Sequence, residues 1–91
     1  MVHPDTQRHT LDPVLGQRLR LERLRQWRSL DDLAAAAGIS RRMLCYLQTG
    51  DRAPSLTVAY RLLAVLGVDT ATGWGAEFMA AAIPDVGKDR H

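Results

Sequence analysis

Residues 34–50 read AAAAGISRRMLCYLQTG and decide the fold. Four alanines favour a helix, and Gly38 can end it because glycine adopts the left-handed backbone conformation at little cost. Ser40 then offers a side-chain cap for a second helix, which opens with two neighbouring cations, Arg41 and Arg42. The stretch therefore predicts two short helices that meet at a tight turn, with both arginines at the start of the second helix.

Helix-starting residues extend this pattern in both directions along the chain. Asp12 followed by Pro13 is typical of a helix start, and Ser29 and Ser55 can cap two further helices. Alanine and leucine are abundant, whereas only 5% of the residues are aromatic, which favours helices over strands. The sequence therefore predicts an all-α protein with five helices, over residues 13–26, 30–37, 41–49, 56–66 and 71–83.

Composition argues against several functional classes. The single cysteine, Cys45, cannot form an internal disulfide, and no neighbouring His or Cys would complete a zinc site with it. The sequence has no nucleophile with an evident base and no Gly-rich phosphate loop, so we expect no enzyme, no cofactor and no metal. No apolar stretch approaches the roughly 20 residues of a membrane span, and the N-terminus lacks the apolar core of a signal peptide. We therefore expect a cytoplasmic protein without a membrane partner.

Positive charge is concentrated in the middle of the chain. Residues 14–61 hold nine arginines and four acidic residues, although the net charge of the whole chain is only +2. Two helices joined by a glycine turn form a helix-turn-helix, whose second helix can enter the major groove of DNA. The break at Gly38 would direct Arg41 and Arg42 outward while Leu44 and Leu47 stay in the core.

Residues 14–68 resemble the helix-turn-helix domain of the Cro/C1 (XRE) type. The resemblance rests on four motifs in matching order and spacing, namely LA at 33–34, GIS at 38–40, TGDRAPS at 49–55 and LLAVLGV at 62–68. It implies a five-helix DNA-binding domain, usually a dimer that acts on palindromic operators as a transcription regulator. Double-stranded DNA is therefore the expected partner.

The resemblance also assigns the DNA contacts. Arginine can donate two hydrogen bonds to one guanine, so we expect a G-containing half-site. The expected base-contacting residues are Arg41, Arg42 and Tyr46, with Ser40 and Cys45 at the margin of that surface. The expected phosphate-contacting residues are Ser29, Arg52 and Ser55. Cys45 is either a redox switch at the DNA surface or simply a small, half-buried residue.

Three positions depart from the pattern of this family. Gln48 replaces a glutamate that usually pairs with an arginine of the first helix, which would be Arg23 here. We expect a hydrogen bond between Arg23 and Gln48 in place of that ion pair, leaving the arginine's charge uncompensated. Glu22 and Arg28 stand where apolar residues are usual.

The last predicted helix carries two apolar stripes. Trp74 and Phe78 are four residues apart and share one face, and Met79 begins the neighbouring stripe. One stripe should pack against the fourth helix, and the other either joins the core or forms a dimer interface. We expect a homodimer interface made by Trp74, Phe78, Met79 and Ala82.

Together these features predict how the chain is organised and what it does. We expect a flexible arm over 1–12, a helix-turn-helix domain over 13–69, a C-terminal dimerisation helix over 70–83 and a disordered tail over 84–91. Arg8 in the arm could reach a minor groove. The expected function is that of a transcriptional repressor that binds DNA as a homodimer. The alternative is a protein-interaction module, or an antitoxin, that binds a partner protein through its C-terminal helix.

Overall fold

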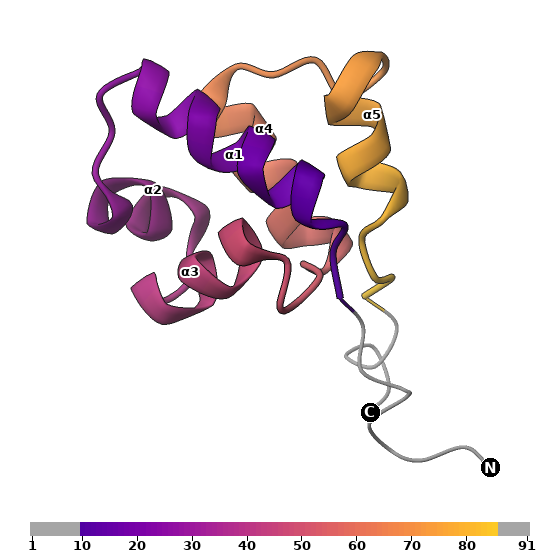
Figure 1. Ribbon diagram of the computed structural model, residues 1–91, viewed down its shortest axis with the longest axis horizontal. Coiled ribbons are helices and arrows are strands. Elements are labelled where there is room, and N and C mark those ends of the chain that lie inside the picture. The colour runs from indigo at the N-terminus through magenta and orange to yellow at the C-terminus, as the bar shows by residue number, and fades with distance from the viewer. Residues whose placement is uncertain (1–9, 86–91) are drawn as a thin grey trace, which may run out of the picture.

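The structure, a computed structural model, describes residues 10–85. Over this range the chain folds into five α-helices, shown in Figure 1: α1 (Pro13–Arg25), α2 (Leu30–Ala37), α3 (Arg41–Thr49), α4 (Leu56–Leu66) and α5 (Gly73–Ala80). Apart from one isolated bridge between Ser55 and Ile83, these residues contain no β-structure. The expectation of an all-α, five-helix protein is confirmed. None of these helices is long and apolar enough to cross a membrane.

Side-chain caps explain why the first four helices begin where they do. The side chains of Asp12, Ser29, Ser40 and Ser55 each accept a hydrogen bond from a backbone amide two or three residues later. Gly38 ends α2 with a φ of 75°, in the left-handed region that the sequence predicted for this turn. Because these signals are local, the predicted starts of α1 to α4 agree with the structure.

The fifth helix is shorter than predicted at both ends. It covers Gly73–Ala80 rather than 71–83, and its N-cap, Thr72, makes no side-chain capping bond. At the other end, Ile83 exchanges backbone hydrogen bonds with the segment that precedes α4, donating to Pro54 and accepting from Leu56 at 2.8 Å each. These bonds hold Ile83 outside the helix.

The core lies where α1, α2, α3 and α4 meet, and α5 closes it. Helix α1 packs across α3, α2 packs against both α3 and α4, and α5 contacts α4 and α1. The buried apolar residues are Leu11, Leu15, Leu19, Leu33, Ala34, Ala37, Leu44, Leu47, Ala59, Leu62, Leu63, Leu66 and Phe78. Phe78 has no exposed surface at all, so the expectation that it lies in a dimer interface is corrected: it is a core residue of the monomer.

Both predicted boundaries of the folded part need correction. Leu11, placed in the flexible arm, is buried, and its amide donates to the carbonyl of Gly50 at 3.1 Å. Asp85, placed in the disordered tail, accepts hydrogen bonds from the amide and the hydroxyl of Thr57 at 2.9 and 2.6 Å. The packed unit therefore includes Leu11 and Asp85, whereas Arg8 and residues 86–91 of the predicted tail lie outside the described residues.

Candidate nucleic-acid interface

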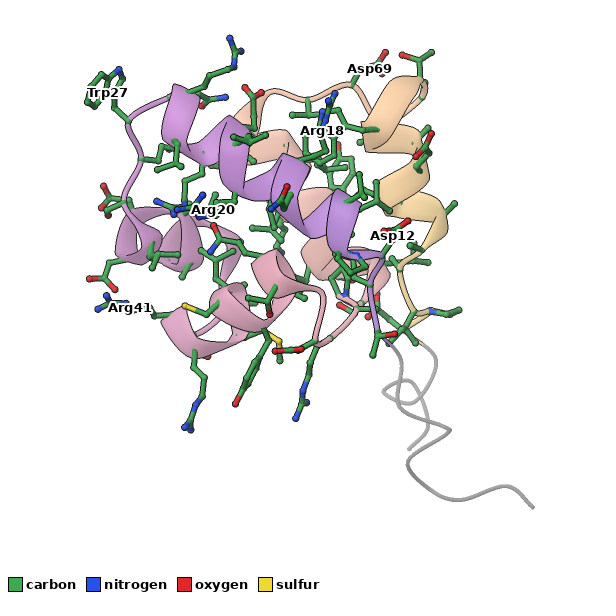
Figure 2. The ribbon with its side chains drawn as sticks, viewed as in Figure 1. Asp12, Arg18, Arg20, Trp27, Arg41 and Asp69 are labelled. Atoms are coloured by element: carbon green, nitrogen blue, oxygen red, sulfur yellow. The ribbon has the colours of Figure 1, made fainter. Side chains whose placement is uncertain are left out.

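Helix α3 has one buried side and one side open to solvent. Leu44 and Leu47 are fully buried, whereas Arg41 and Arg42 are exposed. In Figure 2, α3 lies at one edge of the molecule with Arg41 beside it, while Arg18 lies on the other side of α1 and Trp27 lies beyond the far end of that helix. The open side of α3 is thus free of other helices, as a helix that enters a DNA groove requires.

The two neighbouring arginines differ in their surroundings. The Nε of Arg41 lies 3.9 Å from a carboxylate oxygen of Asp31 on α2, and both side chains are well exposed. Such a pair contributes about 0–1 kcal/mol and is easily exchanged for another anion. Arg42 has no hydrogen bond or ion pair with any described residue, so its guanidinium is fully available.

Tyr46 and Arg52 come together although they belong to different elements. The guanidinium carbon of Arg52, in the loop after α3, lies 5.3 Å from the centre of the Tyr46 ring. Tyr46 is half-buried and Arg52 is exposed, so the contact holds a cation next to the open side of α3. Ser40 caps α3 and is exposed, and Cys45 is half-buried one turn later.

Thr49 is a polar residue on this surface that the sequence reasoning missed. It is exposed, and its hydroxyl lies 3.0 Å from a carboxylate oxygen of Asp51 and 3.1 Å from the carbonyl of Tyr46. It follows Arg42 by seven residues, which is two helical turns, so the spacing alone would have placed it on the same face. The contact with Asp51 could not have been found that way, because Asp51 lies beyond the helix.

The start of α4, where Ser55 is expected to contact a phosphate, is held by hydrogen bonds within the chain. The first three amides of α4 already have acceptors: Leu56 donates to Ile83, Thr57 to Asp85, and Val58 to the Ser55 hydroxyl. The carboxylate of Asp85 lies at this helix start and would repel a phosphate there. Ser55 caps α4, and its contact with a phosphate stays a prediction.

Ser29, expected to contact phosphate at the start of α2, is exposed and available. Its hydroxyl oxygen accepts a hydrogen bond from the amide of Asp32 at 3.0 Å, so it caps α2. The exposed carboxylates of Asp31 and Asp32 lie in the same turn. They suit the positive end of the helix but would repel a phosphate, so the expected phosphate contact of Ser29 stays a prediction.

A buried hydrogen bond connects the core-facing side of α3 to α1. The Nε of Arg23 donates to the side-chain oxygen of Gln48 at 2.9 Å, and its Nη1 donates to the carbonyl of Arg28 at 2.9 Å. The expected Arg23–Gln48 hydrogen bond is confirmed. Burial, followed by the nearby charge of Arg20, lowers the pKa of Arg23 from its ordinary value. An arginine nevertheless stays charged, so this contact ties α1 to α3 around a buried cation.

Gly16 sets the distance between α1 and α3, and the sequence reasoning did not identify it. A Cβ atom built at this position would lie 2.6 Å from the carbonyl oxygens of both Leu47 and Gln48. No side chain fits there without displacing the backbone of the last turn of α3. A glycine within a predicted helix was the available signal, because such a residue often marks a close packing contact.

Two further polar residues fix the turn between α1 and α2. Arg28, half-buried, donates from Nη2 to the carbonyl of Val65 at 3.2 Å, and Gln26 donates to the carbonyl of Leu66 at 2.7 Å. Both acceptors belong to the last turn of α4, where a helix has free carbonyls and partial negative charge. This contact explains why an arginine stands at position 28, where apolar residues are usual, because the guanidinium caps α4.

The described residues contain no group of His, Cys, Asp and Glu side chains that could hold a metal ion.

A comparison with models of protein families identifies the family of this chain. The helix-turn-helix family model HTH_3, of the Cro/C1 type, matches residues 19–72, which include the whole of α2, α3 and α4. A comparison with curated proteins finds no match. The chain therefore belongs to the Cro/C1-type helix-turn-helix family and is a DNA-binding regulator of that type.

Proposed function

We propose that the protein is a repressor that binds a palindromic operator as a homodimer and reads bases with the open side of α3. The observation that carries the proposal is Arg42, an exposed cation that forms no ion pair with a described residue and stands on a helix whose other side is packed into the core. A bidentate contact from such an arginine to guanine contributes about 1–3 kcal/mol of discrimination. Occupying an operator that overlaps a promoter is sufficient for repression and needs no further chemistry.

The other residues of this surface take supporting roles in the proposal. Arg41 exchanges its weak pair with Asp31 for a base or a phosphate. Tyr46 contacts a thymine methyl group or the DNA backbone, and Arg52, held over its ring, contacts a phosphate. Ser40 and Cys45 lie at the margin, and Ser29 lies at the start of α2.

We place the homodimer interface where α4 and α5 meet. Leu56 and Tyr60, one turn apart on α4, are 38% and 58% exposed, and the bond from Leu56 to Ile83 brings the segment that follows α5 beside Leu56. Met79 near the end of α5 and Ala82 just after it are half-buried. Trp74 is left out, because it packs against Phe78 and against Arg18 of α1.

The rival proposal, partner binding through the C-terminal helix, has less support. Phe78 is fully buried, and Trp74, Met79 and Ala82 are partly buried against the core, so the apolar stripes of α5 are largely used within the monomer. What α5 leaves exposed is mostly small or charged, namely Gly73, Glu77 and Ala80. Such a surface is poor in the large apolar anchors that protein partners usually engage.

The test is selection from a randomised DNA pool at roughly 50 and 200 mM salt with the wild-type protein and two variants. The Arg42→Ala variant removes the proposed base contact. The Arg25→Ala variant removes an equal charge from α1, away from α3, and is the matched control. We expect a G-containing palindrome that is lost in Arg42→Ala and kept in Arg25→Ala. If both variants lose affinity equally for all sequences, Arg42 contributes only charge and the assignment of α3 is wrong.

A further inference from the structure

The solvent-facing side of α1 carries three large apolar residues beside its exposed arginines, which neither the fold nor DNA binding explains. Val14, Leu21 and Leu24 are 65%, 53% and 44% exposed. Val14 and Leu21 are two turns apart and so share one face of the helix. Burying a leucine side chain stabilises a protein by about 1.5–3 kcal/mol, so large apolar residues left outside the core gain nothing within the monomer.

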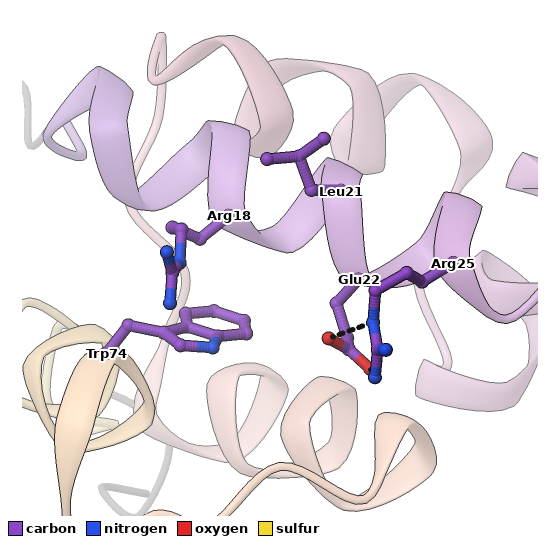
Figure 3. Close-up of a pocket in the computed structure, with 5 residues that line it drawn as sticks. All are labelled: Arg18, Leu21, Glu22, Arg25 and Trp74. Carbon is purple, nitrogen blue, oxygen red and sulfur yellow. Dashed lines mark hydrogen bonds and ion pairs between the residues drawn. The ribbon is translucent and has the colours of Figure 1, made fainter.

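A recess adjoins this face where α1 meets α5. Figure 3 shows Arg18 beside Trp74 on one side of it, and Glu22 with Arg25 on the other. Together with Leu21 these residues line a volume of about 250 Å³. That volume is large enough to receive a side chain from another molecule.

The recess combines apolar surface with positive charge. The guanidinium carbon of Arg18 lies 5.9 Å from the centre of the Trp74 ring, and Arg25 is paired with Glu22 at 3.1 Å. The Glu22 carboxylate also accepts a hydrogen bond from Gln26, so its charge is satisfied within α1. Arg18 forms no ion pair with a described residue, although its charge acts on Glu22 at longer range, and α1 as a whole carries four arginines against one glutamate.

We propose that the recess between α1 and α5 binds an acidic segment of another protein, which inserts an apolar side chain between flanking carboxylates. The apolar side chain would contact Leu21 and Trp74, one carboxylate would meet Arg18, and another would compete with Glu22 for the exposed guanidinium of Arg25. The surface is available on the operator, because α1 lies between Arg18 and α3 (Figure 2). The regulator could therefore hold DNA and this partner together. The inference does not depend on which DNA sequence α3 reads.

Charge and shape favour this occupant over the other candidates. A second copy bound by the same surface would bring arginine against arginine, since a two-fold interface is self-complementary. A nucleic acid would satisfy the arginines but would leave the exposed leucines against a phosphate backbone. A lipid surface would accept leucines and arginines, but a flat bilayer does not fill a concave recess.

The test is a selection from a displayed library of random peptides on the wild-type protein, with counter-selection on the Arg18→Glu/Arg25→Glu variant. Enriched peptides are then synthesised, and their affinities for the wild-type protein and for Leu21→Ser are measured by fluorescence anisotropy. Leu21 is exposed, so this variant should fold, which a thermal melt checks. The Arg42→Glu variant is the matched control, because it reverses a charge on α3 instead.

We expect enriched peptides to carry acidic residues around a large apolar one. Their affinity should fall by about tenfold or more in Leu21→Ser and remain unchanged in Arg42→Glu. Failure to enrich any peptide, enrichment of basic or neutral peptides, or equal affinity for all variants would overturn the proposal. Binding of anionic vesicles that is lost in Leu21→Ser would also overturn it, in favour of a lipid. DNA binding is measured on the same samples, so failure here is distinguishable from failure of the repressor proposal.

Discussion

The buried contact between Arg23 and Gln48 determines how firmly α1 holds α3. Gln48→Met keeps the approximate volume of the side chain but removes the oxygen that lies 2.9 Å from Nε of Arg23. A buried cation then loses a partner, and we expect the free energy of unfolding to fall by about 1–3 kcal/mol. Gln48→Glu supplies a carboxylate instead, and should raise the free energy of unfolding by about 1 kcal/mol at neutral pH. Urea denaturation measures both variants, and a Gln48→Met protein as stable as the wild type would show that this hydrogen bond contributes nothing.

Trp27 combines a left-handed backbone with an unburied ring. Its φ is 58° and the residue is 94% exposed, at the position just after α1 where glycine is usual. Trp27→Gly should therefore raise the free energy of unfolding by about 0.5–1 kcal/mol, because glycine adopts this conformation without a Cβ clash. Trp27→Ala keeps the Cβ and should change stability by less than about 0.5 kcal/mol. Thermal melts of both variants provide the measurement, and a less stable glycine variant would mean that the ring makes stabilising contacts.

At the scale of elements, the crossing of α1 and α3 depends on Gly16. In Gly16→Ala, the added methyl group meets two backbone carbonyls of α3, so the helices must separate. We expect a loss of about 1–3 kcal/mol of unfolding free energy, together with weaker operator binding because α3 is displaced. Gln17→Ala, at the exposed neighbouring position, should be nearly neutral in both assays. Wild-type stability in Gly16→Ala would mean that the crossing can widen at no cost.

The end of α1 should make stability depend on pH. Hydrogen bonds from Arg25 and then Gln26 lower the pKa of Glu22 from its ordinary value of 4.5. Folding thus favours the ionised carboxylate, so its contribution is present above that ordinary value and is lost as the pH falls through the lowered one. We expect the melting temperature to fall below about pH 4.5, and to fall less in Glu22→Gln over the same range. If the melting temperatures of the two proteins fell equally with pH, the acid sensitivity would have to come from other carboxylates.

Elements with local signals could be predicted from the sequence, and elements fixed by distant contacts could not. The caps at Asp12 and Ser29 identify their helices because the bonds span only two or three residues. The end of α5 depends on Ile83 pairing with Pro54 and Leu56, far away in the sequence. Within the candidate site, the open face of α3 follows from helical spacing. The hydrogen bond from the Thr57 amide of α4 to Asp85 could not be predicted without the fold.

At the scale of the whole molecule, the proposals use three different surfaces for three partners. They assign the open side of α3 to DNA, the junction of α4 and α5 to a second copy, and the recess between α1 and α5 to an acidic segment. Because α1 lies between α3 and Arg18 of the recess in Figure 2, binding at one surface should leave the other accessible. The junction of α4 and α5 must then bring two copies of α3 to face successive turns of the same duplex.

This arrangement predicts that loss of dimerisation weakens operator binding without changing base readout. Leu56→Ser/Tyr60→Ser removes two exposed apolar side chains from the proposed interface, so sedimentation should show a monomer where the wild type is a dimer. Affinity for the palindrome should fall roughly 100-fold, because the second half-site is no longer held nearby. Affinity for a single half-site should stay the same, since α3 is unchanged.

Val14→Ser is the control for this prediction. It removes an exposed apolar residue from α1 and should leave both mass and affinity unchanged. A wild-type protein that sediments as a monomer while binding the palindrome tightly would contradict the proposed interface.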